Sequence, residues 1–124
     1  MLSQPPRSCL VLEPIGDVAV IRFSQRSLLG ADLIEKVAAE LLRAVEELGY
    51  RKLILNLGNV ESMTSAMVSK IVVLKQVAEA HGGRLILCKI NPFLFEIFQV
   101  LQLTKSFTIC DEELTALDRF RGQN

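Results

Sequence analysis

Three hydroxyl side chains lie where a predicted apolar strand is followed by an apolar helix, in the stretch VESMTSAMVSKIVVL at residues 60–74. They belong to Ser62, Thr64 and Ser65. A hydroxyl at the start of a helix can cap it, because its oxygen accepts a hydrogen bond from a free backbone N–H. It can also be phosphorylated, since those N–H groups and the helix dipole stabilise added negative charge. With a base in reach, it can act as a nucleophile.

The nucleophile hypothesis fails because the base is too far away. His81 is the only histidine, and it lies sixteen positions after Ser65 on the same predicted helix. At about 1.5 Å per residue, this separation is about 24 Å. The chain also lacks the GxxxxGK[ST] and GxGxxG sequences of phosphate-binding loops. We therefore predict that the protein is not an enzyme.

The cysteines do not indicate a metal site. Cys9, Cys88 and Cys110 form no CxxC pair, and a single histidine cannot complete a zinc site with them. We expect reduced, partly buried thiols, as in cytoplasmic proteins, and no cofactor.

Composition narrows the classes of partner. The chain has 124 residues, half of them hydrophobic, with a mean hydropathy of +0.34, which suits one folded domain. Its 14 basic and 14 acidic residues cancel, so no net charge attracts nucleic acid or an anionic membrane. The longest apolar runs have four residues, against roughly 18 for a membrane span. The N-terminus MLSQPPRSCL does not look like an export signal, so we expect a cytoplasmic protein.

Hydrophobic periodicity predicts the order β-β-α-β-α-β-α-β-α. Alternating helices and apolar strands favour a single α/β domain with a mostly parallel sheet of about five strands, an N-terminal antiparallel hairpin and about four helices. The predicted domain spans residues 8–121, between a lead-in at 1–7 and a tail at 122–124. The hairpin is predicted at 8–24, later strands at 52–57, 84–88 and 106–110, and helices at 28–50, 64–81, 91–103 and 111–120.

The first helix shows a clear apolar stripe. Its residues repeat at four-residue intervals, and Gly49 is a suitable residue to end it. The stripe consists of Leu29, Leu33, Val37, Leu41 and Val45, widened by Ile34, Ala38 and Leu48.

The helix at 64–81 has more apolar residues than one stripe against a sheet requires. We expect some of them, with Met67 and Val73 as candidates, to form an exposed patch that suits a protein partner. The alternative is that a neighbouring helix or loop covers them. Functional sites of parallel sheets gather at the carboxyl ends of the strands, where residues 58–65 and 89–92 are expected.

The chain resembles the STAS domain family, which includes anti-sigma factor antagonists and the cytoplasmic domains of sulfate transporters. The resemblance runs from about Cys9 to Phe120. It is carried by LILNLGNVESMTSAMV and by AHGGRLILCKINPFLFEIFQVLQLTKSF, whose ending is similar to the L…tgLdklf ending of the family.

The resemblance implies a switch at Ser65. Antagonists of this family bind a serine kinase that doubles as an anti-sigma factor, and are switched off when it phosphorylates the serine after the Asp of a DSSG motif. In this alignment Thr64 replaces that Asp, Ser65 is the phosphorylated serine, Ala66 replaces the second serine and Met67 replaces the glycine. Asn56 stands where the family usually has an Asp at the end of a strand.

Two functions remain open at this point. One is an interaction module that binds an anti-sigma factor kinase and is phosphorylated on Ser65 or, second, Thr64. The other is a constitutive structural STAS subunit of a stress-signalling scaffold or a lipid-transport ABC complex. Homodimerisation also stays open. The predicted partner-binding residues are Ser62, Met63, Thr64, Ser65, Ala66, Met67, Lys70 and Asn91.

Overall fold

The computed structural model describes residues 9–122, so the predicted lead-in at 1–7 and the last two residues of the tail lie outside the described residues. A five-stranded sheet has the order β1-β2-β4-β6-β7. The β1–β2 hairpin is antiparallel and the other pairings are parallel, which confirms the predicted sheet. The strands are β1 (Leu10–Ile15), β2 (Val18–Phe23), β4 (Lys52–Asn56), β6 (Arg84–Cys88) and β7 (Thr108–Cys110).

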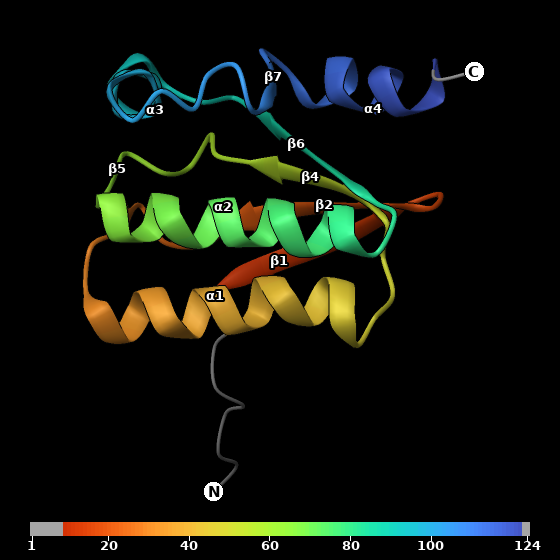
Figure 1. Ribbon diagram of the computed structural model, residues 1–124, viewed down its shortest axis with the longest axis horizontal. Helices are drawn as coiled ribbons and strands as arrows, with labels where there is room; N and C mark the ends of the chain where they lie inside the picture. The colour runs from red at the N-terminus through yellow and green to blue at the C-terminus, as the bar shows by residue number, and fades with distance from the viewer. Residues whose placement is uncertain (1–8, 123–124) are drawn as a thin grey trace, which may run out of the picture.

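Within residues 9–122, four helices connect and cover these strands, in the predicted order (Figure 1). Two further strands of two residues each, β3 (Ser27–Leu28) and β5 (Ser62–Met63), pair in parallel with each other and were not predicted. Such short strands contain too few residues to show a period of two. The helices are α1 (Ala31–Glu46), α2 (Ser65–Ala80), α3 (Pro92–Val100) and α4 (Glu113–Arg121).

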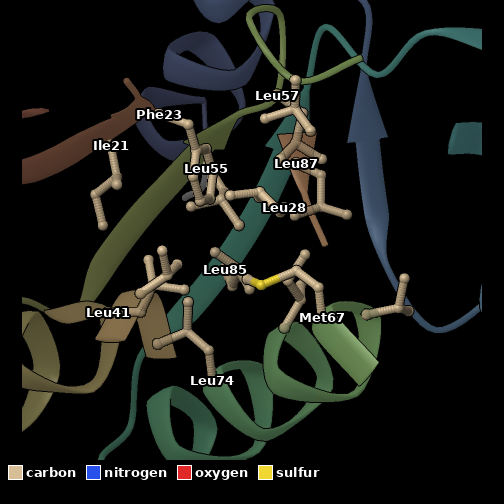
Figure 2. Packing of buried hydrophobic residues seen from close by; sticks show 14 of the residues in the cluster. Ile21, Phe23, Leu28, Leu41, Leu55, Leu57, Met67, Leu74, Leu85 and Leu87 are labelled. Atoms are coloured by element: carbon tan, nitrogen blue, oxygen red, sulfur yellow. The ribbon is translucent and has the colours of Figure 1, made fainter. Parts of the chain in front are cut away.

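The sheet separates two hydrophobic clusters because successive strand residues point to opposite faces. In β2, Ala19 and Ile21 pack in the larger cluster with α1, α2 and α3, whereas Val18 and Val20 pack in the smaller one beneath α4. The central strands are buried on both sides, which explains their continuous apolar runs. Figure 2 shows the larger cluster from within, with Leu55, Leu85 and Leu87 directed toward α2.

The ends of α1 differ from the predicted stripe. Its middle residues are buried as expected, but Leu29 and Leu48 are 51% and 53% exposed and lie outside the helix. The backbone rather than the apolar spacing sets these ends. Gly49 has a φ of 78°, a left-handed conformation that glycine adopts without steric cost and that turns the chain toward β4.

The expected exposure of Met67 is wrong. Its side chain is fully buried and points from α2 into the larger cluster (Figure 2), because α1, β5 and β6 pack against this helix. The alternative, in which neighbouring elements cover it, is therefore correct for Met67. Val73 is 40% exposed, as predicted.

Candidate functional site

The short β3–β5 pair fixes the start of α2. Ser27 pairs with Ser62 and Leu28 with Met63, and the Thr64 N–H donates a hydrogen bond of 3.3 Å to the Leu28 carbonyl. The hydroxyls of Ser62 and Ser27 also lie 3.2 Å apart in a hydrogen bond. Buried Leu28 and Met63 hold this pair against the core. The segment that leads into α2 is therefore held in place by backbone pairing with β3.

Thr64 and Ser65 have different roles. Thr64 is the N-cap of α2, and its hydroxyl oxygen accepts a hydrogen bond of 3.3 Å from the Met67 N–H. Ser65 is the first helical residue and is exposed. Its carbonyl accepts a hydrogen bond from the Ser69 hydroxyl, but its own hydroxyl has no partner among residues 9–122. The capping chemistry thus belongs to Thr64, and Ser65 presents a free hydroxyl.

An open groove of about 260 Å³ lies beside Ser65, and the rest of its lining comes from α3 and the residue after it. We call it the α2–α3 groove; its lining residues are Ser65, Glu96, Ile97, Val100 and Leu101.

The walls of the α2–α3 groove are mostly apolar. Val100 and Leu101 are 75% and 42% exposed, and Phe93, also on α3, is 58% exposed. Glu96 supplies an exposed carboxylate that forms no ion pair within the described residues. These residues were not predicted, although NPFLFEIFQVLQL has more apolar positions than one buried face requires.

The other predicted partner-binding residues are only partly gathered at this groove. Ala66 is exposed beside Ser65, whereas Met63 and Met67 are buried and support the turn from beneath. Lys70 lies one turn further along α2 and pairs with Glu35 of α1 at 3.1 Å.

Asn91 links the two sides of the site. Its side-chain oxygen caps α3 by accepting a hydrogen bond of 2.8 Å from the Leu94 N–H. Its amide group donates to the Val60 carbonyl at 3.1 Å, just before β5. Asn91 therefore positions α3 relative to the segment that leads into α2.

A second polar cluster lies at the carboxyl ends of β2 and β4, on the side of α4. The Arg22 guanidinium binds both carboxylate oxygens of Glu113, at 2.7 and 2.8 Å, and also binds Glu13 at 2.8 Å. The Asn56 amide donates a hydrogen bond to Glu113, while its oxygen accepts one from the Gly58 N–H at 2.7 Å. The bond from Arg22 and the bond from Asn56 lower the pKa of Glu113.

This cluster explains why an amide suits position 56. An aspartate there has no N–H to donate, and it would place a second carboxylate against Glu113. Asn56 instead donates to Glu113 and is 9% exposed, with its polar atoms satisfied. The asparagine and the Glu113 carboxylate are thus a matched pair.

The remaining reactive side chains are not assembled into a site. Ser65 and His81 lie at opposite ends of α2, as predicted. Cys9, Cys88 and Cys110 are buried free thiols, and burial raises the pKa of Cys88 to about 12. Among residues 9–122, no group of three or more His, Cys, Asp or Glu side chains could hold a metal ion. The same part of the chain contains no helix with the length and apolarity to cross a bilayer.

The order of the strands, the helix on the far face of the sheet and the hydroxyl-bearing start of α2 define a STAS-type domain. The family model for the STAS domain matches residues 10–116, and the chain belongs to this family. It is 25% identical over 87 residues to BtrV of Bordetella bronchiseptica strain RB50, a protein named as a candidate anti-sigma factor antagonist. This match covers 70% of the present chain and 74% of BtrV.

Two solved structures of SpoIIAA are similar to it. The unphosphorylated anti-sigma factor antagonist SpoIIAA has 26% identity and a TM-score of 0.70, with 91% of this chain and 98% of that chain covered. The phosphorylated form of the Bacillus protein gives 25% identity and a TM-score of 0.69, with 90% and 98% covered. The present protein is thus an anti-sigma factor antagonist-like STAS domain.

Proposed function

We propose that the protein is a non-catalytic, cytoplasmic interaction module that binds a kinase-type anti-sigma factor through the α2–α3 groove. One observation carries this proposal: the Ser65 hydroxyl, which has no partner among the described residues, lies at the edge of an exposed apolar groove. Exposed apolar surface of this kind suits a protein partner. The relatives named as anti-sigma factor antagonists suggest which class of partner to test.

Phosphorylation of Ser65 would control this contact. A phosphate adds roughly −1.5 to −2 charges at pH 7 and leaves the fold intact, because the free N–H groups of the first turn of α2 partly compensate them. Glu96 lines the same groove, so the phosphate and this carboxylate would repel each other and raise the cost of desolvating the groove. Thr64 is a poorer site for phosphorylation, because its hydroxyl already caps the helix.

A constitutive structural subunit is the second candidate function. It is favoured by the exposed apolar side chains of Phe93 and Val100, which offer a binding surface whether or not Ser65 is modified. The replacement of the acid of the family motif by Thr64 also removes a charge that belongs to the sequence recognised by the kinase.

Affinity purification from the host with matched variants tests the proposal. Ser65→Asp should lose most of the kinase that the wild-type protein captures, whereas Ser65→Ala should retain it. Ser69→Asp, one turn along α2 and also exposed, is the control for added charge and should have a much smaller effect. Circular dichroism should be the same for all four proteins. Equal capture of a large assembly by wild type and Ser65→Asp would favour the structural subunit instead.

A further inference from the structure

A basic pocket lies at the opposite end of the sheet from Ser65, at the amino ends of β4 and β6. This end is on the right in Figure 1, where α2 finishes and β6 begins. The pocket has a volume of about 260 Å³. Its lining residues are Arg51, Lys52, Gly82, Gly83, Arg84 and Phe120.

The backbone brings the two arginine-bearing segments together. The Arg84 N–H donates a hydrogen bond of 2.7 Å to the Arg51 carbonyl, so the two arginines lie on neighbouring strand ends. Gly83 makes this approach possible, because a Cβ at this position would lie 2.3 Å from the same carbonyl oxygen. The loop between α2 and β6 therefore has to cross closely over the start of β4.

The two guanidinium groups are oriented but not neutralised. Arg84 donates to the Thr108 hydroxyl at 3.0 Å, and Arg51 donates to the carbonyls of Val45 and Tyr50 at 3.4 and 3.2 Å. Neither forms an ion pair with a residue of the described chain, 9–122. These neutral oxygens hold the two side chains in place but do not neutralise the positive charge of the guanidinium groups.

Negative groups nearby do not cancel this charge. Lys52 is paired with Asp17 at 2.8 Å, and none of the residues 9–122 places a carboxylate in the lining of the pocket. The carbonyl end of α2 contributes a partial negative charge of about −0.5, which is screened by solvent. The pocket has three cations, Arg51, Lys52 and Arg84, and only Lys52 is paired with a carboxylate of the described residues. The pocket is therefore positive, although the protein as a whole has no net charge.

We propose that this pocket binds a small soluble molecule carrying a phosphate monoester. A phosphate dianion matches the excess of positive charge, and guanidinium groups bind its oxygens with paired N–H donors. The volume lies just below the roughly 300 Å³ at which typical ligand pockets begin, so the organic part is small. The site is separate from the α2–α3 groove and does not depend on the function proposed for that groove.

Titration followed by NMR amide shifts tests the proposal, with glycerol phosphate as the probe at constant ionic strength. The shifts should concentrate at Gly82, Gly83 and Arg84. Because hydrogen bonds to charged groups are the strong ones, Arg51→Gln and Arg84→Gln should each weaken binding about tenfold. Arg26→Gln is the matched control, since Arg26 is 80% exposed at the other end of the molecule, beside Glu61. It should bind as the wild type does.

Using both Arg51→Gln and Arg84→Gln means that the test does not depend on every variant folding. Arg51 is exposed and should tolerate glutamine without loss of stability, even if the half-buried Arg84 does not. Equal weakening by Arg26→Gln, or shifts spread over cations at both ends, would overturn the proposal. So would tighter binding to phosphatidic acid vesicles or to an aspartate-rich peptide than to glycerol phosphate, because the pocket would then serve a membrane or a protein.

Discussion

Two regions at the carboxyl edge of the sheet use polar side chains in opposite ways. On the side of α4, Arg22, Asn56 and Glu113 are hydrogen-bonded to one another and to Glu13 and Gly58. On the other side, at the start of α2, the Ser65 hydroxyl and the Glu96 carboxylate have no described partner and border exposed apolar surface. Polar side chains that are hydrogen-bonded to one another hold the elements together. Polar side chains without a described partner can form hydrogen bonds to a second molecule.

The comparison predicts that substitutions beneath the groove destabilise the fold and substitutions on its surface do not. Met67→Ala should lower the free energy of unfolding by about 3 kcal/mol, because it leaves a cavity under the first turn of α2. Val100→Ala, on the exposed wall of the groove, should cost less than about 0.5 kcal/mol. Urea denaturation measures both. A small loss in Met67→Ala would mean that Met67 is not part of the core.

Removing one member of the satisfied cluster should have the next largest effect. Glu113→Ala should cost about 2 kcal/mol, because it leaves Arg22 and Asn56 without their main partner in a half-buried position. Glu96→Ala is the matched control and should change stability by less than about 0.5 kcal/mol. Equal losses in these two variants would remove the distinction between the two regions.

The same cluster predicts how stability depends on pH. The folded-state pKa of Glu113 is lowered from its ordinary value of 4.5, so its ion pair stabilises the fold at neutral pH. This contribution should be lost as the pH falls below about 4.5 and through the lower folded-state pKa. Glu113→Gln should therefore lose less stability than the wild type between pH 6 and about pH 3. An unchanged acid response in this variant would exclude Glu113 as a source of it.

Removing each of the two neighbouring hydroxyls should change stability by a different and smaller amount. Thr64→Ala removes the N-cap of α2 and should cost about 1 kcal/mol. Ser65→Ala removes a hydroxyl without a described partner and should be nearly neutral in urea denaturation. A large loss for Ser65→Ala would assign it the capping role and weaken the proposed switch.

The sequence predicts the fold better than the site. The periodicity of the long helices and the apolar runs of the central strands depend on local spacing, and both predictions are confirmed. The burial of Met67 was mispredicted because α1, β5 and β6 all pack against α2, which one helical period does not reveal. Arg22 and Glu113 are 91 positions apart, so no local pattern indicates their ion pair.

Some features of the candidate site can be predicted from the sequence, and others are seen only in the structure. The run of hydroxyls and its resemblance to the family motif single out Ser65 and Thr64 together. Only the hydrogen bond from the Met67 N–H to the Thr64 hydroxyl distinguishes a capping residue from a free one. The α2–α3 groove also needs the structure, because α3 begins 27 residues after Ser65, at Pro92, and only the fold brings the two together.

Intact mass and peptide mapping of protein purified from its own host, with phosphatase inhibitors present, would show directly whether Ser65 is a phosphorylation switch. We expect a phosphate on Ser65 and none on Thr64, in at least one growth or stress condition. Phosphate on Thr64 instead would contradict the choice of Ser65 as the phosphoacceptor. An unmodified peptide under every condition would contradict the switch and leave a constitutive binding module.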